Sequence, residues 1–482
     1  MLKSRLLIGL PLAALTLLPP GMPAAMAQAQ SAPQSGSTVF DSGIYRDLFG
    51  TREMRAVFGD ASLIEKWLRF EVELAAAQAD QGVIPRKAAQ AIAKAAVPAN
   101  IDIDKLRAGT DKVGRPIAPL VDLVAKAGGE EVSDYLHFGA TTQDVMDTAT
   151  VLQIKDALDI VQPQLKGLIL RIAAMAKQYR ATPMVARSNG QDAVPTTFGM
   201  LLASYMTELA RDAVRLEEVR HRVLVGQYGS AVGTLSAAGP KGLAVRKDLM
   251  KRLGLGEPDL SWNASRDNFA ELVQTLALVH GALNRVANDV NLWSRTADNE
   301  VNEGEGGASS TMPQKRNPRA SEYLGGLAKL AFMRAGGAYD MLGQSETRQG
   351  APWISEWSTI PEMFLLTAQS LKRADGLFAK MIVRPEVMLA RFRDSQGYAM
   401  SEAVMTFITP KLGRGPAYHL VKSAIKAAPK GASLRDVILQ TPKLLDAVGK
   451  DNLDRVLDPT SYIGLAPQMV DEAVARALAA NR

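Results

Sequence analysis

Long stretches of helical periodicity constrain the fold of this chain more than any other feature of the sequence. Apolar residues recur at intervals of three and four over residues 60–82, 151–180, 197–225 and 267–293. The three longer stretches would each make a helix of roughly 40 Å, which suits an elongated bundle better than a compact globule. Strand signals are sparse, and no Asn-Gly hairpin turn is recognised between alternating runs. The sequence therefore predicts an all-α fold.

The expected helices divide into three parts. We place a helical N-terminal domain at 38–146, a central bundle of long helices at 147–383 and a helical C-terminal domain at 384–482. Alanines such as Ala173 and Ala174 allow close approach of helices, and the long helices carry more apolar surface than one chain can cover. We therefore expect the bundle to be shared between subunits of a homotetramer, rather than to form a monomer.

The first 27 residues have the pattern of a secretory signal peptide. Lys3 and Arg5 precede the apolar run 6–18, and the stretch ends in the cleavage signal Ala-Met-Ala at 25–27. The apolar run has 13 residues, whereas a helix needs roughly 20 to cross a bilayer, so a cleaved signal is favoured over a membrane anchor. The mature protein is then expected to be periplasmic or secreted, free of the membrane, with a disordered polar tail over 28–37.

Composition excludes several classes of function. The chain has no cysteine, which removes thiol chemistry and cysteine-ligated zinc, and none of its four histidines is spaced with another as metal ligands are. Loss of the first 27 residues removes two basic and no acidic residues, so the formal charge falls from +6 to +4. No block of lysine and arginine marks a nucleic-acid surface, and a mild positive charge is compatible with a small anionic substrate.

The segment from Gly304 to Pro318, GEGGASSTMPQKRNP, carries the strongest chemical signal in the chain. Its glycines make a mobile loop, after which come two adjacent hydroxyls at Ser309 and Ser310. A cation and an amide follow at Lys315 and Asn317. A lid that carries a base to an anionic substrate needs this order of residues. The alternative is a surface loop built from turn residues.

This segment resembles the GSSxMPxKxNP loop of the fumarase/aspartase superfamily, with Ala308 where most members have glycine. Two further segments resemble the other signature regions of that superfamily, in the expected order. They are residues 137–149, HFGATTQDVMDTA, and residues 187–199, RSNGQDAVPTTFG. The resemblance extends over roughly 43–427, and it implies an elongated central helical bundle with smaller helical domains at both ends.

Two positions depart from the superfamily pattern. Asn189 stands where fumarases and adenylosuccinate lyases have a histidine, and Glu322 matches the carboxylate that orients that histidine. Asn263 occupies a second position that usually holds a histidine. An asparagine cannot shuttle a proton near neutral pH, so the acid–base relay of adenylosuccinate lyases is not expected. The carboxymuconate cycloisomerase branch also lacks the first histidine, and residues 353–357, WISEW, resemble that branch.

The resemblance also implies a mechanism. A proton leaves the carbon beside a carboxylate and a group leaves the neighbouring carbon, so the enzyme must stabilise developing negative charge. Ser309 is implied as the base, with Lys315 favouring its alkoxide and His137 as a further catalytic residue at the substrate. No metal and no organic cofactor are implied. Substrate binding is expected from Thr141, Thr142, Gln143, Asn189, Gln191, Ser310, Asn317 and Arg348.

We therefore expect an exported lyase or cycloisomerase that acts on a small di- or tricarboxylate. Because both auxiliary histidines are replaced, an internal carboxylate or hydroxyl leaving group is favoured over a free amine. Two alternatives stay open. One is a C–N lyase of the adenylosuccinate lyase type that uses His137 as its acid, and the other is a non-catalytic relative that binds carboxylates.

Overall fold

The computed structural model describes residues 36–304 and 306–480. The predicted signal peptide and most of the predicted disordered tail lie outside the described residues. The chain divides into two compact units, residues 1–47 and 48–482. In the described part of the first unit, the carboxylate of Asp41 accepts hydrogen bonds from the amide and hydroxyl of Thr38. All further description concerns the second unit.

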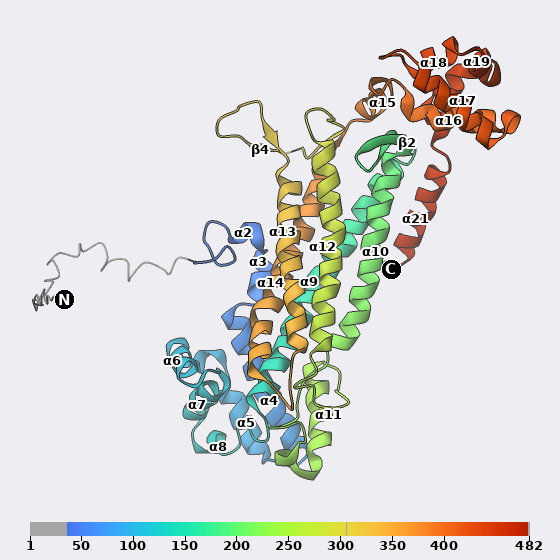
Figure 1. The fold of residues 1–482 in the computed structure, drawn as a ribbon. Coiled ribbons are helices and arrows are strands. Elements are labelled where there is room, and N and C mark those ends of the chain that lie inside the picture. Colours follow the sequence, from blue (N-terminus) through green and yellow to red (C-terminus); the bar gives the residue numbers. More distant parts are fainter. Residues whose placement is uncertain (1–35, 305, 481–482) are drawn as a thin grey trace, which may run out of the picture. The chain divides into compact units, whose positions relative to one another are not determined.

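Five long helices form the centre of this unit (Figure 1). They are α9 (Thr142–Gln178), α10 (Phe198–Val223), α12 (Asp267–Trp293), α13 (Arg319–Gly337) and α14 (Gly350–Lys380). The predicted all-α fold with a central bundle of long helices is confirmed, and α12 has the bounds that its apolar stripe predicted. α9 starts nine residues earlier than the apolar repeat indicated and continues through Pro163.

The remaining helices come before, between or after these five in the chain. Those before it are α2 (Arg46–Phe49), α3 (Arg52–Val57), α4 (Asp60–Asp80), α5 (Arg86–Ala95), α6 (Ile103–Val113), α7 (Ile117–Gly128) and α8 (Glu130–Ser133). α11 (Gly242–Leu253) lies between α10 and α12 in the chain. After the bundle come α15 (Pro385–Asp394), α16 (Ser401–Leu412), α17 (Arg414–Ala427), α18 (Leu434–Gln440), α19 (Pro442–Val448), α20 (Leu453–Leu457) and α21 (Ala466–Ala480). The last of these returns to pack on α9 and α10 (Figure 1).

Three short two-stranded sheets lie within the described residues, and one of them corrects the sequence analysis. β1 (Pro183–Ser188) pairs antiparallel with β2 (Gln191–Thr197) through a turn at Asn189 and Gly190. Both turn residues have positive φ, 52° and 74°, as a two-residue hairpin turn requires. The statement that no Asn-Gly hairpin is present was therefore wrong. The other sheets pair β3 (Val301–Asn302) with β6 (Ile382–Val383) and β4 (Gly307–Ala308) with β5 (Arg316–Asn317).

Contacts between helix termini establish the direction of each long helix. Arg266, directly before α12, forms ion pairs with Asp147 near the start of α9 and Glu356 near the start of α14. At the opposite end, the rings of Phe198 and Trp293 lie 5.8 Å apart, so α10 begins beside the end of α12. We call these two ends of the bundle the His137 end and the Ser309 end, after the predicted site residues that lie there.

The helices of the N-terminal region pack around the His137 end. A continuous apolar core joins α4, α5, α7, α8, α11 and the first turns of α9, and it includes Phe70, Leu74 and Leu120. A separate core, with Val404 and Ile438 at its centre, holds α16 to α20 together. The predicted domain boundaries stay predictions. Among the described residues, no helix is both long and apolar enough to cross a membrane.

Candidate active site

His137 lies in the turn that leads into α9, and its backbone has a positive φ of 60°. Its Nδ1 lies 2.6 Å from Oε1 of Glu71, a residue of α4 whose side chain is only 2% exposed. An ionised carboxylate can only accept a hydrogen bond, so Nδ1 carries the hydrogen of this pair. The imidazole is therefore held in one orientation, with Nε2 left to meet a substrate.

The surroundings of His137 favour its charged form. Burial lowers the pKa of His137, but attraction to Glu71, the hydrogen bond to Glu71 and attraction to Asp144 outweigh burial, so the net shift of the pKa is upward. Burial raises the pKa of Asp144 to about 7, although backbone amides of Thr141, Gly229 and Ser230 donate to it. In its charged form, His137 can act as a proton donor or hold an anion.

The predicted carboxylate-binding residues of the first signature region follow at the start of α9. Thr141 is the N-cap of that helix, and its amide donates to Asp144 in a capping box. Nη1 of Arg348 lies 3.4 Å from the hydroxyl of Thr141, so the structure brings these two predicted residues together. Thr142 is half-buried beside them, in the first turn of α9.

Gln143 was predicted to bind the substrate, but its side chain takes part in a hydrogen-bond network inside the protein. Its side chain is buried, and its Nε2 donates to the backbone oxygen of Asn263 at 2.9 Å. The Asn263 side chain in turn accepts a hydrogen bond from Gln227 and is buried as well. The amide donor of Gln143 is therefore engaged inside the protein, where it ties α9 to the segment before α12. Asn263, in a place where relatives usually have histidine, belongs to this internal network.

The Ser309 end holds the loop that was predicted to supply the base. The hydroxyl oxygen of Ser309 accepts hydrogen bonds from the backbone amides of Thr311 at 3.3 Å and Met312 at 3.0 Å. Two donors aimed at one oxygen stabilise negative charge on it, as in an oxyanion hole. Ser310 and Lys315 are exposed. The two ends of the loop are joined by the pairing of β4 with β5, in which Asn317 lies opposite Gly307.

The second signature region lies at the same end. Asn189 is exposed at the hairpin turn, and Gln191 is exposed at the first position of β2. Arg187, on β1, is engaged in a cluster with Glu300 at 2.7 Å, Asp298 and Asp192. Glu322, matched by resemblance to a histidine-orienting carboxylate, pairs instead with Arg319 at 2.6 Å. No described residue places an imidazole beside it.

One chain does not unite the two groups of predicted residues. His137, Thr141 to Gln143 and Arg348 lie at one end of the bundle, and Asn189, Gln191 and the Ser309 loop lie at the other (Figure 1). Between them runs α9, whose 37 residues span about 55 Å. A substrate of a few ångströms therefore cannot touch both groups within one copy.

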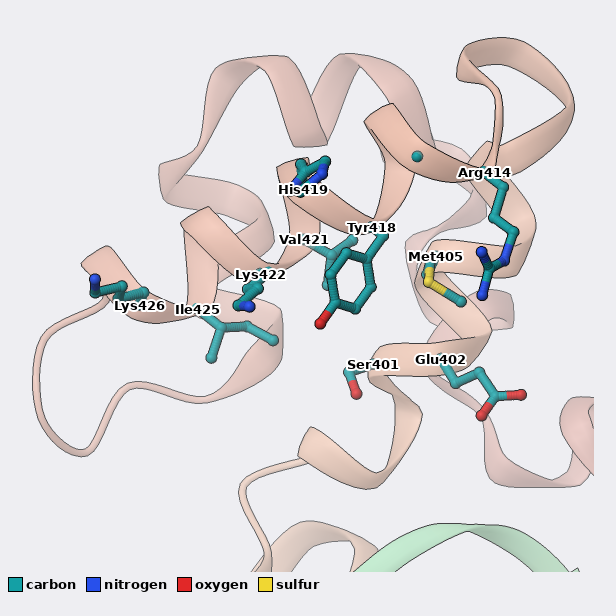
Figure 2. A pocket seen from close by; sticks show the side chains of 11 residues that line it. Ser401, Glu402, Met405, Arg414, Tyr418, His419, Val421, Lys422, Ile425 and Lys426 are labelled. Carbon is teal, nitrogen blue, oxygen red and sulfur yellow. The ribbon is translucent and has the colours of Figure 1, made fainter.

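A hollow of about 800 Å³ lies in the C-terminal region between α16 and α17. Figure 2 shows Tyr418 and Ser401 facing each other across it, with Arg414, Lys422 and Lys426 around it. His419 is exposed at this hollow. None of the predicted site residues lines it. The residues that line the hollow therefore do not support a catalytic site there.

Sequence reasoning missed Glu71 and Arg115 at the His137 end. Glu71 lies between Phe70 and Leu74 on the apolar face of α4, and a charged residue on such a face is the one signal that could have revealed it. Arg115 lies in the loop between α6 and α7, with its guanidinium over the rings of Trp353 and Trp357. Neither partnership could be read from spacing, because the partners are far apart in the chain.

Comparison with known proteins gives the chain relatives over most of its length. Residues 50–332 match a family model described as "Lyase", and residues 397–473 match one described as "Adenylosuccinate lyase C-terminus". The chain is 36% identical to the N-acetyl-S-(2-succino)cysteine lyase of Dickeya dadantii, with 88% of this chain and 94% of that protein aligned. It is 34% identical to trans-aconitate decarboxylase 1 of Mycosarcoma maydis, with 90% and 89% aligned.

A solved structure shows the same likeness in three dimensions. The 3-carboxy-cis,cis-muconate lactonizing enzyme of Pseudomonas putida is similar with a TM-score of 0.85 and 33% sequence identity. The match covers 91% of this chain and 100% of that one. At this identity and coverage, the likeness extends to the whole arrangement of helices and not to one domain alone.

The Glu71–His137 pair predicts a change in titration. In Glu71→Gln the attraction that raises the pKa of His137 is lost while its burial is kept, so the pKa of His137 should fall. The measurement is the pH titration of the imidazole in protein with ¹³C-labelled histidine. Glu73→Gln, on the same helix but paired with Arg252, is the control and should leave His137 unchanged. Equal titration curves in wild type and Glu71→Gln would contradict the pairing.

Proposed function

The chain belongs to the fumarase/aspartase superfamily of lyases and cycloisomerases, and we propose that its substrate is a small di- or tricarboxylate. The reaction is elimination or addition beside a carboxylate. Ser309 takes a proton from the carbon next to the carboxylate, and the electron pair of that C–H bond moves towards the carboxylate. The bond from the neighbouring carbon to the leaving group then breaks, the leaving group departs with that electron pair, and a carbon–carbon double bond forms. In the reverse direction a carboxylate adds to the double bond, Ser309 returns the proton to the carbon beside the other carboxylate, and a lactone forms.

The observation that carries this proposal is the hydrogen bonding of the Ser309 hydroxyl oxygen. Two backbone amides donate to it, and such donors lower the energy of the alkoxide that must act as the base. Lys315 follows six residues later and supplies a positive charge to the same loop. The names of the relatives support the substrate class, because trans-aconitate and 3-carboxymuconate are both unsaturated tricarboxylates.

A C–N lyase reaction is the second candidate, because of the Glu71–His137 pair. A departing amine must receive a proton, and an imidazolium with a raised pKa can provide it. A non-catalytic carboxylate-binding role stays the third alternative. It is favoured by no contact within the described residues, and turnover of any substrate excludes it.

We also propose that the active protein is a homotetramer. The separation of the two groups of site residues requires more than one copy for a complete site. The bundle helices also expose large apolar side chains that a partner could cover, among them Leu170, Val214, Leu278, Leu292, Phe332 and Met333. Closed rotational symmetry would place the His137 end of one copy beside the Ser309 end of another and so complete several equivalent sites.

Export to the periplasm or beyond is likewise a proposal, supported by the charged, apolar and Ala-Met-Ala segments of residues 1–27. An exported enzyme would meet polycarboxylates before their uptake and would not take part in cytoplasmic purine synthesis.

Removal of the proposed base should abolish catalysis. We expect Ser309→Ala to lower kcat by about 10²- to 10⁴-fold on every substrate that the wild type turns over, because the proton acceptor is lost. Turnover is followed by alkene absorbance with carboxymuconates, aconitates, fumarate and aminated succinates. Ser310→Ala is the matched control, with a milder loss expected. Full activity of Ser309→Ala would refute the assignment of the base.

Two inactive variants should restore activity when their subunits mix. Ser309→Ala and His137→Gln each damage one end of the bundle, so a site that joins two copies can escape both changes. After denaturation and refolding of an equal mixture, about a quarter of the sites should be intact, whereas each variant refolded alone should stay inactive. Light scattering should give the mass of four chains. Failure to regain activity while tetramers form would count against shared sites.

Export is tested by cell fractionation. The full chain, expressed in a Gram-negative host, should accumulate in the periplasm with a new N-terminus close to Gln28, and a chain that starts at Gln28 should stay in the cytoplasm. Mass spectrometry of the purified protein locates the cut. Recovery of the full chain uncut from the cytoplasm would contradict the proposal.

A further inference from the structure

Arg115 is held on a platform of two tryptophans at the His137 end. Its guanidinium carbon lies 5.1 Å from the ring centre of Trp353 and 5.0 Å from that of Trp357. The two rings meet edge to face at 5.3 Å. The indole nitrogen of Trp353 donates to Asp147 at 2.9 Å, so the platform is anchored to α9. The stacked guanidinium is therefore fixed in place by rigid neighbours.

The guanidinium of Arg115 has no acidic partner among residues 36–304 and 306–480. Its Nη1 donates a hydrogen bond to the backbone oxygen of Gly114, at 2.6 Å. A guanidinium has five N–H donors, so most of those of Arg115 stay available. By contrast, Arg187 and Arg266 are each engaged with carboxylates. A half-buried cation with free N–H donors can bind an anion.

A second unpaired guanidinium lies close by. Nη2 of Arg115 would lie 3.4 Å from a methyl group placed on Gly350, so the Arg115 guanidinium lies beside the first residue of α14. Arg348 precedes Gly350 by two residues, and its side chain reaches the hydroxyl of Thr141 without pairing with any described acidic group. Two like charges in one part of the structure repel each other unless an anion lies with them.

We propose that Arg115 binds a third carboxylate of the substrate, so that it selects tricarboxylates over dicarboxylates. This inference rests on the proposed function. Arg348 and Arg115 would each take one carboxylate at the His137 end of one copy. Lys315 of a neighbouring copy would take the carboxylate beside the carbon that loses its proton. Three cations then match the three negative charges of an unsaturated tricarboxylate.

A purely structural role for Arg115 makes a different prediction. If the guanidinium only pinned the two tryptophans, its loss would loosen the start of α14 and weaken all carboxylates equally. If it binds the third carboxylate, its loss would affect tricarboxylates alone. The ratio of the two substrate classes therefore separates the roles, whereas the activity on one substrate does not.

The test compares Arg115→Gln with wild type on matched pairs of ligands, trans-aconitate against fumarate and 3-carboxymuconate against cis,cis-muconate. We expect kcat/KM for the tricarboxylate to fall about 10- to 100-fold, because charged hydrogen bonds are lost. For the dicarboxylate, kcat/KM should stay within about twofold of the wild-type value. Arg115→Lys, which keeps the charge, should lose less. Lys112→Gln removes an equal charge from the exposed end of α6 and should change neither class.

Binding by calorimetry to Ser309→Ala, with and without Arg115→Gln, gives a readout that does not depend on turnover. Selective weakening of tricarboxylate binding supports the proposal, even if none of these ligands is turned over and the proposed reaction fails. Equal weakening of both classes, no weakening, or no binding of either tricarboxylate to the starting protein would overturn it.

Discussion

The buried guanidinium of Arg266 holds together the part of the structure on which the site depends. Its side chain is fully inaccessible and pairs with Asp147 of α9 and Glu356 of α14, directly before α12 begins. Three helices that are distant in sequence are thereby fixed at one point. Burial of such charges is costly, and it raises the pKa of Glu356 even though Arg266 opposes the shift. The cluster therefore fixes how the three helix ends meet.

The tryptophan platform under Arg115 is connected to that cluster. Asp147 also accepts from Trp353, and Trp353 supports Arg115. Asp144, one turn earlier on α9, caps the helix through Thr141 and receives the amides of Gly229 and Ser230. The side chains that face a substrate are thus positioned by buried polar contacts on rigid helices, as an active site requires.

The periodicity of the sequence predicted much of the fold, and for a physical reason. An apolar stripe such as Phe269, Leu276 and Leu283 must be buried along a helix, so the bounds of α12 followed from the stripe alone. The β1–β2 hairpin was missed because its strands are short and carry polar residues and Pro195, so the alternation around Asn189 and Gly190 is weak. The Glu71–His137 and Arg115–Trp353 contacts depend on how helices pack, which local pattern does not encode.

The chemistry of the site depends on how few imidazoles the chain retains. Asn263 is engaged with Gln227 in the interior, and Asn189 occupies a hairpin turn, so neither replacement restores a proton donor. Of the four histidines, His280 is fully buried, and burial lowers its pKa to about 3, which leaves it neutral. His221 and His419 are exposed, and His221 pairs only with Glu217 on the surface of α10.

Among the described imidazoles, His137 is the one that pairs with a buried carboxylate, and Glu71 biases it towards the charged form. A single fixed donor can protonate one leaving group, or it can hold one carboxylate, but it cannot do both in the same complex. If His137 binds a carboxylate, the leaving group must depart without its help, as an internal carboxylate does when a lactone opens. In that case the opening of a lactone needs no second proton donor, whereas the release of an amine does.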